Sequence, residues 1–134
     1  MAAGNLYDGR EQGRIYRVMP KGVEQGLWPG NQLLGNSFTG ELIAALALDN
    51  IWWRGHTQRL LVDTYRSGSM APEDLTELEA MALNTDQPLG RLHALWTLDG
   101  IGRLRPELIV DALGDSSAGV RENAIKKSLF LKTS

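Results

Sequence analysis

The hydrophobic residues follow two different patterns along the chain, and the change comes at about residue 39. From there to the end, apolar side chains recur every three or four positions, which places them on one face of an α-helix. Breaks rich in Gly, Asn, Ser and Pro divide this region into segments. The pattern predicts helices at 39–48, 52–65, 72–83, 88 to near 100 or 102, and 106–113, and a sixth helix capped by Ser116 or Ser117 that reaches about residue 131. Pro72, Pro88 and Pro106 support three of the starts, because proline is favoured in the first turn of a helix.

The first 38 residues lack this helical spacing. Within 14–19, basic and apolar side chains alternate, which is the pattern of a strand with one buried face, and Pro20 ends it. The chain between residues 20 and 38 is rich in Pro, Gly and Asn and is expected to be irregular. We therefore expect residues 1–38 to form a tail, a short strand and an irregular arm, followed by a helical domain over residues 39–134.

One arrangement of residues returns three times in the helical region. Each copy has an Asp at the end of a turn, an Arg in the first turn of the next helix, and a small or hydroxyl residue three positions after the Arg. The copies lie roughly 30 to 40 residues apart, a period typical of stacked helix pairs. The sequence therefore predicts an all-α solenoid of about three helix pairs behind a short N-terminal strand or extended arm.

The recurring Asp and Arg have two interpretations. In the structural one, each Asp accepts backbone N–H groups at a helix start, and each Arg pairs with the Asp of the next copy in a ladder of charge-assisted hydrogen bonds. In the functional one, the Arg side chains form a row that binds phosphate or carboxylate groups. The residues of this candidate ladder are Asp49, Arg54, Asp86, Arg91, Asp115 and Arg121.

The two histidines of the chain also follow the repeat. His56 and His93 each come two positions after an Arg, so stacked copies would place them in one polar column. Two histidines without a nearby third ligand make a poor metal site. Acid–base chemistry at this column and a plain polar helix face are the alternatives. The small residues Thr57, Ala94 and Ala124 are expected where paired helices approach closely.

Composition removes several classes of chemistry. The 134 residues include no Cys, which excludes disulfides, thiolate metal sites, a cysteine nucleophile and covalently attached c-type haem. No serine lies in a nucleophile elbow, and no glycine-rich loop joins a strand to a helix. We therefore expect no cofactor, no metal and no enzymatic activity.

Charge and hydropathy bear on partners and location. The net charge of −2 gives no overall attraction to nucleic acid or to an anionic membrane. The longest apolar run, residues 42–48, is far shorter than a membrane span, and the N-terminus has no stretch typical of a signal peptide. As written, the chain is expected to be cytoplasmic.

Two strings resemble a known group of proteins. Residues 52–61 (WWRGHTQRLL) and 91–102 (RLHALWTLDGIG) resemble part of the large planctomycete-type dehydrogenases, which are membrane-bound or secreted. Those proteins join a sugar-dehydrogenase-like β-propeller to HEAT-like repeats and a c-type cytochrome. Residues 7–10 (YDGR) and 13–22 (GRIYRVMPKG) resemble the end of that propeller. The resemblance implies a HEAT-like solenoid, and an exported location for most of the family.

The chain also departs from these dehydrogenases. It contains almost none of the propeller and no haem-attachment motif, so none of the family's cofactor or calcium residues can be assigned to it. The resemblance therefore implies a fragment of a larger protein, for which a mobile gene cassette or environmental DNA is a natural source.

Two functions remain in competition. The first is a non-catalytic helical-repeat module for protein–protein interaction or self-association, whose partner is unknown. A homodimer through residues 13–28 is one form of it, because the strand at 14–19 has no second strand to pair with. The alternative is a nucleic-acid-binding protein of the HEAT-like kind found among alkylpurine DNA glycosylases, with the Arg side chains following a phosphate backbone. The negative net charge weighs against it.

Overall fold

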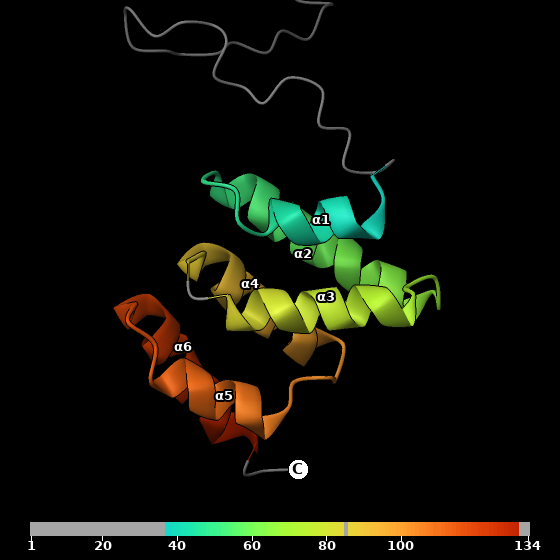
Figure 1. Ribbon diagram of the computed structural model, residues 1–134. Helices are drawn as coiled ribbons and strands as arrows, with labels where there is room; N and C mark the ends of the chain where they lie inside the picture. Colours follow the sequence, from blue (N-terminus) through green and yellow to red (C-terminus); the bar gives the residue numbers. More distant parts are fainter. Residues whose placement is uncertain (1–36, 85, 132–134) are drawn as a thin grey trace, which may run out of the picture. The chain divides into compact units, whose positions relative to one another are not determined.

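The computed structural model describes residues 37–84 and 86–131, all of which belong to one compact unit. These residues form α-helices and no strand, so the predicted all-α class is confirmed for them (Figure 1). The predicted strand at 14–19 and the proposed dimer arm at 13–28 lie outside the described residues. The helices are α1 (Thr39–Ala45), α2 (Ile51–Arg66), α3 (Pro72–Leu83), α4 (Pro88–Gly100), α5 (Pro106–Leu113) and α6 (Ala118–Leu131).

Consecutive helices pack in pairs: α1 with α2, α3 with α4, and α5 with α6. The second helices of the pairs contact one another in the order α2, α4, α6, and the first helices in the order α1, α3, α5. Figure 1 shows the pairs following one another from the α1–α2 pair to the α5–α6 pair, with α3 and α4 between them. We call these the first, second and third pair.

The ends of the helices follow local hydrogen bonding. Asn50 caps α2, because its side chain accepts from the Trp52 backbone N–H at 2.9 Å. Before α3, the Asp74 carboxylate accepts from the Ala71 N–H at 2.8 Å. Gly102, with φ of 69°, ends α4 in the left-handed conformation that glycine adopts most readily. α1 is shorter than predicted, because residues 46–48 continue it with i→i+3 bonds of the tighter 3₁₀ kind.

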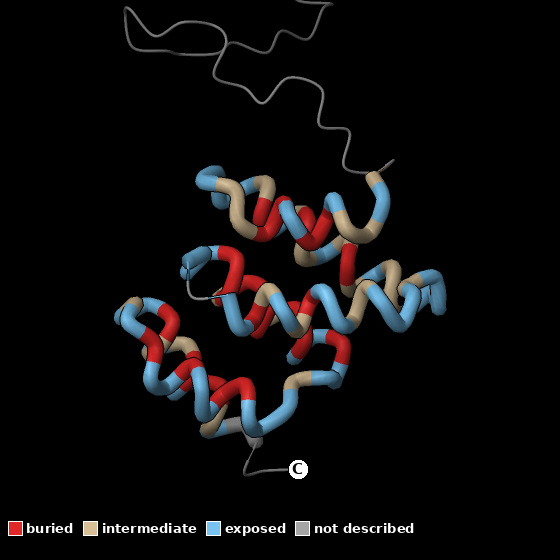
Figure 2. Tube along the Cα trace, in the orientation of Figure 1, coloured by how far each residue is buried: buried red, intermediate tan, exposed pale blue. Residues whose placement is uncertain are grey.

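The core is centred on α4, in which seven of thirteen residues are buried. Leu61, Leu78 and Leu98, from α2, α3 and α4, are fully enclosed. Figure 2 shows the buried residues of each helix along the sides that face other helices. The small residues of the repeated pattern behave as expected, because none of the following is more than 1% exposed: Thr57, Ala94 and Ala124.

Gly90 lies where α4 packs closely against α3 and against the connection from α1 to α2. A Cβ atom at this position would lie 2.7 Å from the Met81 sulfur and 3.1 Å from the Ala47 Cβ. A larger residue at this position would require both neighbours to shift. Within residues 37–84 and 86–131, every helix is too short or too polar to cross a lipid bilayer.

Candidate functional site

The three Arg of the repeated pattern occupy the same place in their helices. Arg54, Arg91 and Arg121 are each the fourth residue of α2, α4 and α6. Arg54 and Arg91 are 6% and 4% exposed, and Arg121 is half-buried. The recurrence in sequence thus corresponds to a recurrence of position, at the junction between a turn and the second helix of each pair.

Arg54 and Arg121 bind the backbone of the turn that precedes their own helix. Nη1 of Arg54 donates to the carbonyl of Leu48, six residues earlier. Nη1 of Arg121 donates to the carbonyls of Asp115 at 2.6 Å and Ser116 at 2.9 Å. Both guanidinium groups therefore donate to carbonyl oxygens of the preceding turn, and they hold that turn against the start of the helix.

Arg91 instead links the second pair to the third. Its Nη1 lies 2.8 Å from Oδ2 of Asp115, and the two side chains are 4% and 3% exposed. The other oxygen of Asp115 accepts from the Ser117 N–H at 2.6 Å, at the start of α6. Nε of Arg91 and Oδ2 of Asp115 have no hydrogen-bond partner, so the contact is an ion pair and not a bidentate hydrogen-bonded pair. Asp115 therefore accepts a backbone N–H at the start of α6 and also pairs with the Arg of the preceding helix pair. These are the two roles that the sequence suggests for the repeated Asp.

The other two Asp of the repeated pattern, Asp49 and Asp86, take neither of these roles. Asp49 and Asp86 are exposed, and within the described part of the chain no ion pair joins Arg54 to Asp86. At the start of α2 the cap is Asn50, the residue after Asp49. The expected ladder therefore has a single inter-pair contact, between Arg91 and Asp115.

The two histidines have different surroundings. His93 is buried, and its Nδ1 donates to Oε1 of Gln58 at 3.0 Å, which joins α4 to α2. Burial lowers the pKa of His93, and the positive charge of Arg54 lowers it further. His56 is half-buried and stacks on Trp52, with ring centroids 6.2 Å apart and planes 4° from parallel. Among residues 37–84 and 86–131, no three His, Cys, Asp or Glu side chains gather as a metal site.

The polar contacts between α4 and α6 were not predicted from the sequence. Trp96 donates through Nε1 to Oδ1 of Asn123 at 3.0 Å. Lys127 places Nζ 3.3 Å from the centre of the Trp96 ring and pairs with Asp99. Lys127 is only 6% exposed. A lysine is almost always read as a solvent-facing residue, so the sequence carries no local signal for this contact.

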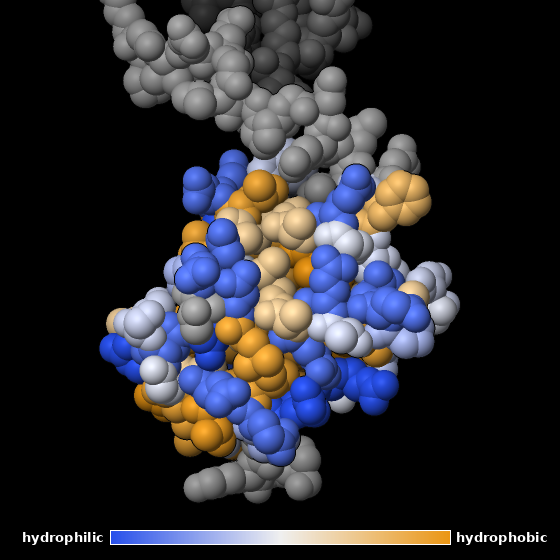
Figure 3. Space-filling model, in the orientation of Figure 1, coloured by the Kyte–Doolittle hydropathy of each residue, from blue (hydrophilic) through white to orange (hydrophobic). Residues whose placement is uncertain are grey.

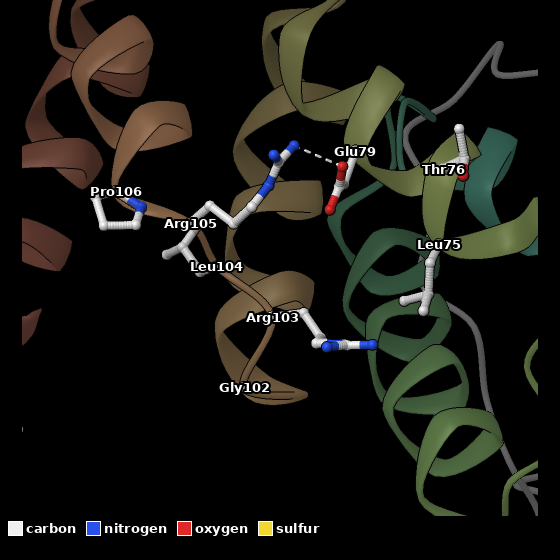
Figure 4. Close-up of a pocket in the computed structure, with 8 residues that line it drawn as sticks. All are labelled: Leu75, Thr76, Glu79, Gly102, Arg103, Leu104, Arg105 and Pro106. Carbon is white, nitrogen blue, oxygen red and sulfur yellow. Dashed lines mark hydrogen bonds and ion pairs between the residues drawn. The ribbon is translucent and has the colours of Figure 1, made fainter. Parts of the chain in front are cut away.

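An open groove of about 490 Å³ lies between α3 and the connection from α4 to α5 (Figure 4). Arg105 reaches across to Glu79 at 2.7 Å, and Arg103 also lines the groove. Both partners of the ion pair are partly in water, with exposures of 56% and 31%. The groove therefore offers exposed charges but no enclosed polar group aimed at a ligand.

Apolar side chains are most exposed on the first and third pairs. Figure 3 shows hydrophobic surface gathered over α5 and α6 on the face in view. In the second pair, the two exposed large apolar side chains, Leu83 and Leu89, reach only 45% and 39%. Those that exceed half exposure are Phe38 (82%), Ile51 (65%), Trp52 (65%), Val110 (67%), Ile125 (53%) and Leu129 (66%).

Comparison of the chain with family models, with curated proteins and with solved structures finds no match.

Proposed function

We propose that residues 39–134 form a HEAT-like helical-repeat solenoid that acts without catalysis, by associating with another protein or with another copy of itself. Support for the repeat comes from the equivalent places of Arg54, Arg91 and Arg121 and from the order in which the pairs contact one another. In such a solenoid each pair covers the next, and the two ends keep uncovered faces.

The observation that carries the proposed association is the exposure of apolar side chains at both ends. Trp52 and Ile51 on α2 and Leu129 on α6 are each about two-thirds exposed, whereas the second pair has no large apolar residue above 45%. Exposed apolar side chains that lie together on a folded domain are typical of an interaction site, and Ile51 and Trp52 line one open surface of α2. The end faces are therefore the surfaces that we assign to partner binding.

The nucleic-acid alternative draws less support from the same geometry. A row of Arg that follows a phosphate backbone needs guanidinium groups in solvent. Arg54 and Arg91 are buried, and they are engaged by the carbonyl of Leu48 and the carboxylate of Asp115. These contacts favour a structural role for the Arg column.

Site-specific photo-cross-linking tests the proposal. A photoreactive phenylalanine analogue replaces Trp52 on α2, Ile125 on α6 or, as a matched control, the exposed Ala80 on α3. After irradiation in the pure protein and in extract of its host, we expect polypeptide adducts at positions 52 and 125 and few at position 80. Adducts that nuclease removes would favour the nucleic-acid alternative, and absence of protein adducts at both end positions would contradict the proposal.

A further inference from the structure

Successive second helices meet at the residues four and eight positions after the Arg. On α6, the residues at these two positions are exposed. On α2, Gln58 and Val62 come four and eight residues after Arg54. Gln58 bonds to His93 of α4 at 3.0 Å, and Val62 lies against Gly100 of α4, where an added Cβ would be 3.2 Å from Cγ2 of Val62. The positions four and eight after the Arg are therefore those with which α2 meets the next second helix.

At the same positions, α4 has one buried residue and one residue that contacts α6. Leu95 and Asp99 come four and eight residues after Arg91. Leu95 is 3% exposed, and Asp99 pairs with Lys127 of α6. Because residues four apart lie on the same side of a helix, both belong to one stripe.

On α6, none of the residues that the structure describes covers the equivalent stripe. Ile125 and Leu129 come four and eight residues after Arg121, and they are 53% and 66% exposed. Both are apolar, whereas the stripes of α2 and α4 each contain a polar residue, Gln58 or Asp99, that bonds to the next second helix. The face that would meet a further second helix is thus the most apolar of the three.

The surface that receives such a stripe is also defined by the described pairs. On α4 and α6 it includes the position two after the Arg. There His93 binds the stripe residue Gln58, and Asn123 accepts from Trp96, the residue next to Leu95 of the stripe. The equivalent residue on α2 is His56, and Trp52, 65% exposed, is stacked on its ring. α2 therefore presents an uncovered receiving surface with an exposed aromatic side chain.

Resting on the proposed function, we infer that two copies of this chain dock head to tail, with the Ile125–Leu129 stripe of α6 of one copy against the Trp52–His56 surface of α2 of the other. The docking continues the α2–α4 and α4–α6 interfaces across a molecular boundary. Because two different surfaces meet, the contact is heterologous and each pair of docked copies keeps one free face at either end. Association should therefore continue beyond the dimer as concentration rises.

Complementation between two variants tests this arrangement. Trp52→Glu removes the receiving surface, and I125E/L129E removes the stripe. All three substitutions are at residues more than half exposed. In sedimentation velocity from micromolar to near-millimolar protein, we expect the intact chain to exceed dimer mass and each variant alone to stay monomeric. An equimolar mixture should form a heterodimer and stop there, because each variant keeps the surface that the other lacks. Leu83→Glu on α3 is the matched control and should associate like the parent.

The outcomes separate the competing arrangements. If Trp52→Glu still dimerises while I125E/L129E does not, the contact is a symmetric α6–α6 interface and the head-to-tail arrangement is overturned. Failure of the mixture to form a heterodimer overturns it as well. A milder pair, I125S/L129S, replaces I125E/L129E if circular dichroism reports a changed fold. If the intact chain stays monomeric while positions 52 and 125 cross-link to other proteins, self-docking fails and the proposed interaction module stands.

Discussion

Arg91 and Asp115 form a charge pair from which water is almost excluded. Removing both charges from water is costly, and their mutual attraction and the bond from the Ser117 N–H offset that cost. A buried pair of this kind adds modest net stability, but the loss of one partner leaves the other charge buried and uncompensated. The pair therefore fixes how the third pair of helices is placed on the second.

Arg91→Ala should lower the free energy of unfolding by about 3–5 kcal/mol, the scale for breaking a buried ion pair. Urea denaturation followed by circular dichroism measures the change. Arg105→Ala provides the matched control, because its pair with Glu79 is partly in water and should contribute at most about 1 kcal/mol. Similar small losses for both variants would show that Arg91 is not structurally buried in solution.

His93 makes stability depend on pH in a defined direction. Its pKa is lowered in the folded state from 6.5, so the unfolded chain takes up the proton more readily as the pH falls. The folded state should therefore lose stability as the pH falls through the unfolded value and on towards the lower folded value. Between about pH 8 and about pH 5, melting temperatures of the parent should fall more steeply than those of His93→Gln. Parallel curves for the two proteins would contradict the burial of His93.

At the scale of helices, the sequence and the structure agree on elements and differ on contacts. The three- and four-residue spacing and the prolines at 72, 88 and 106 locate the helices, because both are local properties of the chain. Which Asp meets an Arg depends on the turn geometry and on the neighbouring pair, so the sequence identified Asp115 together with two Asp that remain exposed. The buried Lys127 was missed for the same reason, since only the position of Trp96 on another helix explains it.

Gly90 and Gly55 make a matched test of helix packing. Gly90→Ala would bring a methyl group against Met81 and Ala47, and we expect a net loss of about 1–3 kcal/mol from overpacking. Gly55 lies in α2 with no atom within 4 Å of an added Cβ, so Gly55→Ala should stabilise the chain by up to about 1 kcal/mol through helix propensity. Thermal melts of both variants measure the difference. Stabilisation by both substitutions would mean that α4 does not approach α3 and the connection from α1 to α2 this closely.

At the scale of the whole molecule, the second pair of helices contacts both the first and the third, and α4 is common to both interfaces. In an array of this kind, stability is approximately the sum of the pairs and of their neighbour contacts. The second pair should therefore hold the first and third together, and damage to α4 should affect all the described helices.

Ala94→Asp tests that dependence. Ala94 is fully buried in α4, so the substitution places an unpaired carboxylate between packed helices, and we expect the whole helical domain to unfold. Far-ultraviolet circular dichroism and thermal melting report the loss of helix. Ala80→Asp introduces the same charge at an exposed site in the neighbouring α3 and should leave the fold intact. A cooperative melt of Ala94→Asp at the parent's temperature would refute the assigned packing.

We propose that this protein meets its partner at the two end faces and not at the Arg column. Hydrogen–deuterium exchange of the unmodified chain, compared between dilute and concentrated protein, tests it without any substitution. We expect exchange to slow at high concentration in peptides from α2 and α6 and to stay unchanged in α3. Added double-stranded DNA should protect none of the helices. Protection confined to α3, or protection by DNA at the starts of α2, α4 and α6, would contradict the claim.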